Sequence, residues 1–133
     1  MGYRSAVTAV IYGDKDKLNT YMAADKLKGD TSVFAYFKGA LTRIVIPFAK
    51  AELHALVLEC DHVKWYDDYD DVKAWHRFME DSPNHDLNYE FIRVGEDHDD
   101  IQQEQDGEAI DGLLYTTVNI EKDYPKPTKE EIL

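Results

Sequence analysis

The sequence predicts an α+β fold: a mostly antiparallel sheet of about five strands, with two to three helices packed on one face. Two observations lead to this fold class. The 133 residues are 44% hydrophobic and 12% aromatic, which is enough apolar surface for one buried core. Runs rich in β-branched and aromatic residues outnumber the segments with helical spacing, so the few helices are expected to cover a single face of the sheet.

The N-terminal part of the chain predicts a strand followed by two helices. Residues 4–12 are rich in β-branched side chains, and Asp14 is placed to cap the helix that follows. Residues 15–27 carry apolar side chains at the i, i+3, i+4 spacing of a helix face. Residues 32–41 fit either a short helix that ends near Gly39 or an aromatic-rich strand, and we favour the helix.

Two β-rich runs come next, over residues 43–48 and 53–65, and they are expected to pair as a hairpin. A helix over residues 50–58 is the alternative for the second run. Pro47 cannot donate a hydrogen bond to a neighbouring strand, so the first run is expected to lie at a sheet edge or to end there. An open edge of this kind could also pair with the same strand of a second copy, which would give a homodimer.

The clearest helical spacing spans residues 69–80, and Asp67, Asp68 or Asp70 can cap this helix and favour its positive N-terminus. Residues 88–94 then alternate between the two faces of a strand. These two segments give the second half of the chain its helix and its best strand.

The remaining residues predict less regular structure. Residues 95–112 are rich in acids and Gln, and we expect a loop or a short polar helix around 99–105. Residues 113–120 predict a last strand. We therefore expect a single domain over residues 1–122, followed by a flexible C-terminal tail over residues 123–133.

The charge is distributed unevenly. Residues 1–58 hold 8 Lys and Arg against 5 Asp and Glu, a net charge of +3, whereas residues 59–133 hold 7 against 22, a net charge of −15. The whole chain has a net charge of −12 and a pI near 4.7. Such a field attracts cations and basic protein surfaces and repels nucleic acid and anionic membranes. Solubility is the plainer explanation of the same charge.

Composition disfavours several classes of protein. A basic nucleic-acid binder is a poor interpretation, because phosphate contacts need cations. No apolar run approaches the roughly 18–20 residues of a membrane span, and no apolar secretory segment follows Met1. Cys60 is the single cysteine, so no internal disulfide can form and a cysteine-built metal site is not expected. We expect a reducing cytoplasm as the compartment.

The motifs of common enzymes are missing from this sequence. No two histidines have the i, i+4 spacing of a zinc-binding helix, and phosphate-loop, dinucleotide and nucleophile-elbow motifs are missing. Asp61 and His62 are adjacent, but on a strand they point to opposite faces, which disfavours a catalytic pair. The carboxylates of residues 95–108 suit Ca²⁺ or Mg²⁺ without the spacing of an EF-hand, so a divalent ion or a solvated loop both stay open here. We predict no enzyme and no cofactor.

Aromatic and acidic residues interleave in the segment after Lys64, and a second acidic run follows Gly95. Trp and Tyr side chains rimmed by charge are typical of protein interfaces and equally typical of a small core. We predict that a partner binds Trp65, Tyr66, Asp67, Asp68, Tyr69, Asp70, Asp71, Glu96, Asp97, Asp99 and Asp100.

Several short motifs resemble a group of small acidic accessory proteins of tailed bacteriophages and prophages, most of which have no assigned role. They are the opening Met1–Ser5, Val63–Tyr66, Tyr69–Val72, Phe91–Asp97 and Asp99–Ile101. The similarity would extend from residue 1 to about residue 120. The resemblance implies an accessory phage protein acting in the host cytoplasm, and it transfers no catalytic residue. Small acidic phage proteins include inhibitors of host defence, some of which mimic the charge of DNA.

Two hypotheses follow from the charge and the resemblance. In the first, the protein docks its acidic face on a basic surface of a host protein, for example a nucleic-acid-binding defence factor, and inhibits it. In the alternative, it is an accessory domain that binds a small molecule, a nucleotide or a divalent metal ion.

Overall fold

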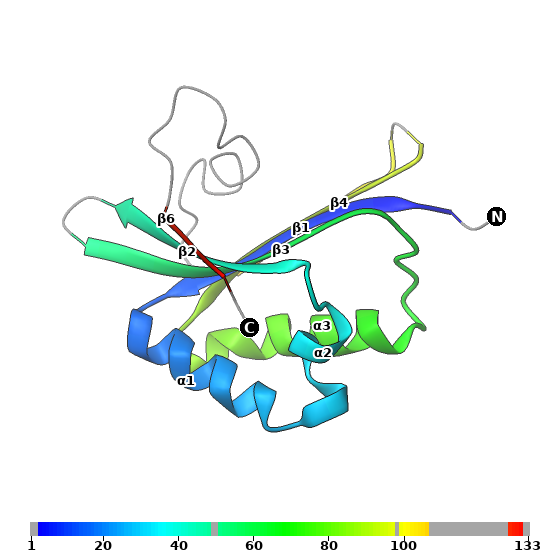
Figure 1. Cartoon of the computed structure of the whole chain (residues 1–133). Coiled ribbons are helices and arrows are strands. Elements are labelled where there is room, and N and C mark those ends of the chain that lie inside the picture. Colours follow the sequence, from blue (N-terminus) through cyan, green and yellow to red (C-terminus); the bar gives the residue numbers. More distant parts are fainter. Residues whose placement is uncertain (1–2, 49–50, 98, 107–127, 132–133) are drawn as a thin grey trace.

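The structure is a computed structural model that describes residues 3–48, 51–97, 99–106 and 128–131. The strands and α-helices are β1 (Ser5–Gly13), α1 (Lys15–Lys26), α2 (Val33–Tyr36), β2 (Leu41–Phe48), β3 (Ala51–Val63), α3 (Asp70–Asp81), β4 (Asn88–Gly95), β5 (Ile101–Asp106) and β6 (Thr128–Glu131). The strands form one sheet in the order β5-β4-β1-β3-β2-β6, and each pair of neighbours is antiparallel. All three α-helices lie on the same face of this sheet (Figure 1). The predicted α+β class and its one-sided helices are confirmed.

The four central strands follow a recognisable connectivity. Both β1 and β2 are antiparallel to β3, which lies between them, and both β3 and β4 are antiparallel to β1. With helices connecting β1 to β2 and β3 to β4, this is the split βαβ, or ferredoxin-like, arrangement. The strands β5 and β6 extend the sheet on its two sides.

Both faces of the sheet bury apolar side chains. On the helix side the most buried residues include Val7, Ala9, Ile11, Leu18, Leu56, Leu58, Trp75, Met79 and Phe91. On the other face a smaller cluster consists of Val10, Tyr12, Ile44, Ala55 and Val57. Successive residues of β1 therefore alternate between the two clusters, as the two-residue period of a strand requires.

The structure settles the two segments that the sequence left open. Residues 33–36 form the helix α2, whose first turn is capped by the Ser32 hydroxyl accepting from the Phe34 N–H. Residues 51–58 belong to β3, so the alternative helix over 50–58 is not formed by the described residues. The hairpin of β2 and β3 pairs Leu41 with Leu58 and Phe48 with Ala51, as predicted.

Residues 101–106 differ from the prediction of a loop or a polar helix. They form β5, which pairs with β4 from Val94–Ile101 to Tyr89–Asp106. In β5 the half-buried Gln102 and Glu104 alternate with exposed residues. A hydrophobicity pattern does not reveal this two-residue period, because polar side chains lie on both faces of the strand.

The remaining expectations concern the cap of α3, the open edge of β2 and the C-terminal part of the chain. The N-cap of α3 is Tyr69, and no side-chain hydrogen bond caps it, so the predicted Asp caps are wrong. Residues 128–131 of the expected tail pair with residues 42–45 of β2, and the edge proposed for a homodimer is covered there by the chain itself. The strand predicted over 113–120 lies outside the described residues.

Candidate functional site

Two acidic segments that are distant in sequence meet at one end of the sheet. Tyr3 joins them: its backbone N–H donates to the Tyr66 hydroxyl at 2.6 Å, and its own hydroxyl donates to Asp100 Oδ2 at 2.6 Å. The same hydroxyl accepts from the Asp97 N–H at 3.1 Å. Figure 1 shows the connection from β3 to α3 and the turn from β4 to β5 at this end, near the N-terminus. Tyr3 therefore links Tyr66 of the first acidic segment to Asp97 and Asp100 of the second.

Most carboxylates of these segments face solvent. We call this surface the acidic tip; its exposed acidic residues are Asp67, Asp68, Asp70, Glu96, Asp97 and Asp99. Tyr69, with 38% of its surface exposed, and the half-buried Tyr66 stack edge to face beside it with ring centroids 5.1 Å apart. The acidic tip thus offers negative charge with two aromatic rings.

The Tyr66 hydroxyl accepts from the Tyr3 N–H, and the exposed Glu96 accepts from the Arg4 N–H at 2.7 Å. Three more of the predicted residues have internal roles. Trp65 is only 7% exposed and packs in the helix-side core, which is the alternative that composition had left open. Asp71 is half-buried and accepts from the Val72 N–H at 2.8 Å. Asp100 pairs with Arg93, whose Nη2 donates to Asp100 Oδ1 at 2.7 Å and whose Nη1 donates to Oδ2 at 3.1 Å. These contacts stabilise the fold, so the side chains of Trp65, Asp71 and Asp100 are not available to bind a partner.

The contacts of Asp100 change its acidity. The Arg93 guanidinium, followed by the Tyr3 hydroxyl, lowers the pKa of the Asp100 carboxyl to about 2. The same pairing raises the pKa of Arg93 above its ordinary value. Asp100 is therefore a structural anion at neutral pH.

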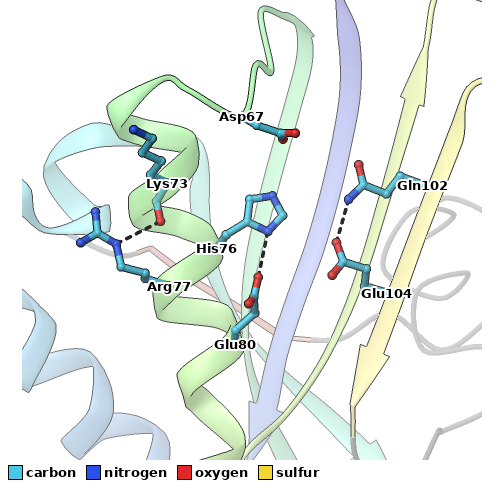
Figure 2. A pocket seen from close by; sticks show the side chains of 7 residues that line it. All are labelled: Asp67, Lys73, His76, Arg77, Glu80, Gln102 and Glu104. Carbon is cyan, nitrogen blue, oxygen red and sulfur yellow. Dashed lines mark hydrogen bonds and ion pairs between the residues drawn. The ribbon is translucent and has the colours of Figure 1, made fainter.

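A second site lies beside the acidic tip, between α3 and the outer strand of the sheet. It is an open pocket of about 740 Å³ that we call the α3–β5 pocket, and it is lined by Asp67, Lys73, His76, Arg77, Glu80, Gln102 and Glu104. Figure 2 shows that the side chains of Lys73 and Arg77 point away from His76, and the Arg77 Nε donates to the Lys73 carbonyl oxygen at 3.4 Å. The part of the pocket around His76 is therefore lined by groups that accept protons or bind cations.

Three possible metal ligands converge in this pocket. His76 Nδ1 lies 3.4 Å from Glu80 Oε2, one helical turn along α3. The ligand atoms of His76, Glu80 and Glu104 all lie within 4.8 Å of one another. Glu104 comes from β5, so the group spans two elements that are distant in sequence (Figure 2).

Neighbouring side chains hold two of these ligands in place. The His76 ring packs against Trp65 and Phe91, with centroid distances of 6.1 and 5.3 Å. The Gln102 amide donates to Glu104 Oε2 at 2.8 Å. Supporting contacts of this kind orient ligands before a metal binds.

Sequence reasoning missed this group. The i, i+4 spacing of His76 and Glu80 on the predicted helix is the signal that could have found them, because a carboxylate can replace the second histidine of a zinc-binding pair. Glu104 belongs to the acidic segment 95–108 that was considered for Ca²⁺ or Mg²⁺, yet its partners in the structure come from α3. A segment interpreted as a loop or helix gave no way to place Glu104 opposite His76.

Comparisons of the chain with family models, with curated proteins and with solved structures find no match. Among the described residues, no helix is long and apolar enough to span a bilayer. Fold and surface therefore define the class on their own: an acidic α+β protein with a ferredoxin-like strand order, an acidic tip and an adjoining pocket.

Proposed function

We propose that this protein is a phage-encoded accessory protein that binds a basic surface of a host protein through its acidic tip and inhibits that protein in the host cytoplasm. The observation that supports it is the convergence of two acidic segments at one end of the sheet, joined through Tyr3. Exposed carboxylates from both segments then act on a partner together.

The charge of the tip suits a target that itself binds nucleic acid. The basic surface of such a target is arranged to hold phosphates, and exposed carboxylates can take their place. Like charges on the tip also repel nucleic acid, so the interaction is with the protein and not with its ligand. Rim charges mainly steer association, and they make the interaction sensitive to salt.

The test uses two double variants that remove the same charge from opposite ends of the sheet. Asp97→Asn with Asp99→Asn removes two of the six exposed charges of the acidic tip, whereas Asp16→Asn with Asp86→Asn removes two exposed charges after β1 and before β4, at the other end. The wild-type protein is used to capture a partner from host lysate, and the partner is then purified for binding measurements at low and high salt.

We expect the tip variant to bind its partner roughly tenfold more weakly at low salt, because charge pairs on an interface rim govern the association rate. The control variant should bind like the wild-type protein. Duplex DNA should compete with the wild-type protein for the partner. Equal weakening in both variants, or binding that is insensitive to salt and DNA, contradicts the proposal.

The alternative function, binding of a small molecule or divalent ion, is supported by a different observation. The α3–β5 pocket brings together an imidazole and two carboxylates. Its metal form is argued below.

A further inference from the structure

We propose that His76, Glu80 and Glu104 bind a divalent first-row transition-metal ion, with Zn²⁺ as the ion that best fits these ligands. One imidazole nitrogen and two carboxylate oxygens are available within 4.8 Å of one another. This inference is independent of the docking of a partner on the acidic tip.

The ligand types decide between classes of ion. Ca²⁺ and Mg²⁺ prefer sites built from oxygen alone, whereas an imidazole nitrogen suits zinc and its neighbours. Three protein ligands with an open fourth position are typical of zinc sites that keep a water molecule. The pocket is open beside these residues, so the fourth position has room for water.

One distance between ligand atoms matches that expected around a bound ion, and the others lie within 4.8 Å. Ligand atoms at about 2.0–2.2 Å from a tetrahedral ion lie roughly 3.3–3.6 Å from one another. The separation of 3.4 Å between His76 Nδ1 and Glu80 Oε2 already meets this value. The Glu80 side chain is 54% exposed and can adjust, whereas the His76 side chain is 20% exposed and held by aromatic rings.

The charges of the pocket also favour a cation. Glu80 and Glu104 approach each other across the pocket, and Asp67 lines the same pocket. Carboxylates this close repel one another unless a proton or a cation lies between them. The cations Lys73 and Arg77 point away from His76, so they do not fill this role (Figure 2).

A bound ion would connect α3 to the outermost strand at this side of the sheet. Within the described residues β5 pairs with β4 alone. Binding to the folded state should therefore stabilise the protein, by an amount that grows with the free metal concentration.

The experiment uses untagged full-length protein stripped with a chelator. Calorimetry measures Zn²⁺ binding, and Co²⁺ absorbance in the visible range reports direct coordination. The variants His76→Gln and Glu104→Gln each remove one ligand from a different element. The control is His85→Gln: His85 Nε2 lies 3.2 Å from Asp81 Oδ2 with the same i, i+4 spacing, and outside the three-ligand group.

We expect one Zn²⁺ ion per chain, weakened at least tenfold by either ligand variant and unchanged by His85→Gln. Gln102→Ala should weaken binding about tenfold, because it removes the hydrogen bond that orients Glu104. Circular dichroism and urea unfolding of the metal-free variants confirm that they remain folded. The Asp97→Asn, Asp99→Asn protein should bind Zn²⁺ like the wild type, which separates this proposal from partner docking.

Two results would overturn the proposal. One is the lack of Zn²⁺ binding to the wild-type protein. The other is equal binding by the Glu104→Gln and His85→Gln variants, which would mean that helix α3 binds the ion without β5.

Discussion

The acidic tip and the α3–β5 pocket both use carboxylates, but they arrange them in opposite ways. The tip takes its acids from two runs that are dense in sequence, and these acids lie exposed to solvent on a turn and a loop. The pocket takes one residue from a strand and two from a helix, and their ligand atoms meet within 4.8 Å. Asp67 belongs to both regions.

The difference shows what each region can bind. Exposed charges spread over one surface create a broad electrostatic field, which suits a large partner surface of opposite charge. Ligand atoms that converge on one point suit a single small ion. Neighbouring side chains already orient His76 and Glu104, so binding the ion orders these two side chains little further. A run of acidic residues in a sequence therefore predicts a negative electrostatic surface. A ligand site depends instead on which helices and strands the fold brings together.

The largest expected effect concerns Trp65, whose ring belongs to the helix-side core and contacts His76 of the pocket. Trp65→Ala should lower the free energy of unfolding by about 3–5 kcal/mol, since the side chain is 7% exposed and packs on Phe37, Phe91 and His76. Urea denaturation measures this loss.

Tyr69→Ala is the matched control, because Tyr69 lies in the same segment with 38% exposure. Its cost should stay below about 1 kcal/mol. The Trp65 variant should also lose Zn²⁺ affinity, because His76 loses a neighbouring ring. If both variants are as stable as the wild type, Trp65 is available to a partner and the boundary between core and tip is wrong.

The fold was largely predictable from the sequence. β-branched residues located β1, alternation along the chain located β3 and β4, and helical spacing located α1 and α3, since each of these elements buries apolar side chains at regular intervals. The strand β5 was missed because its pairing uses backbone groups while its side chains are polar on both faces. Sheet pairing of residues 128–131 has no local signal at all in so short a segment.

The sites were predictable only in part. The sequence identified the acids of the tip, but it could not tell that Asp100 is paired with Arg93 while Asp97 and Asp99 are exposed. That distinction depends on Arg93 of β4 and on Tyr3, which precedes β1 and is distant from the turn in sequence. To predict the α3–β5 pocket, one would have to know that β5 lies beside α3, and no local sequence pattern contains this information.

The ion pair between Asp100 and Arg93 should make the free energy of unfolding depend on pH. Because the Asp100 carboxyl has a folded pKa of about 2, below its ordinary value near 3.9, it stabilises the folded state when ionised. The wild-type protein should be more stable than Asp100→Asn at neutral pH. This difference should shrink as the pH falls below about 4, and it should vanish as the pH passes the folded pKa. Urea unfolding of both proteins at a series of pH values measures it.

Tyr3→Phe offers a graded comparison, because it removes one donor to Asp100 and leaves Arg93 in place. Its effect should have the same pH dependence with a smaller amplitude, since Arg93 lowers the pKa of Asp100 more than Tyr3 does. A difference between wild type and Asp100→Asn that stays constant down to the lowest pH would show that the ion pair does not contribute to folding.

The smallest expected effect is the most informative about the acidic tip. Asp97→Asn with Asp99→Asn should change the free energy of unfolding by no more than about 0.5 kcal/mol, as for other exposed sites. The turn keeps its hydrogen bonds, because they use backbone atoms: the Asp97 carbonyl accepts from the Asp100 N–H, and the Asp99 carbonyl accepts from the Ile101 N–H. Urea unfolding beside the partner-binding assay measures both properties on one protein. Unchanged stability with weakened binding assigns these two carboxylates to the partner, whereas a clear loss of stability would place them, like Asp100, in the support of the fold.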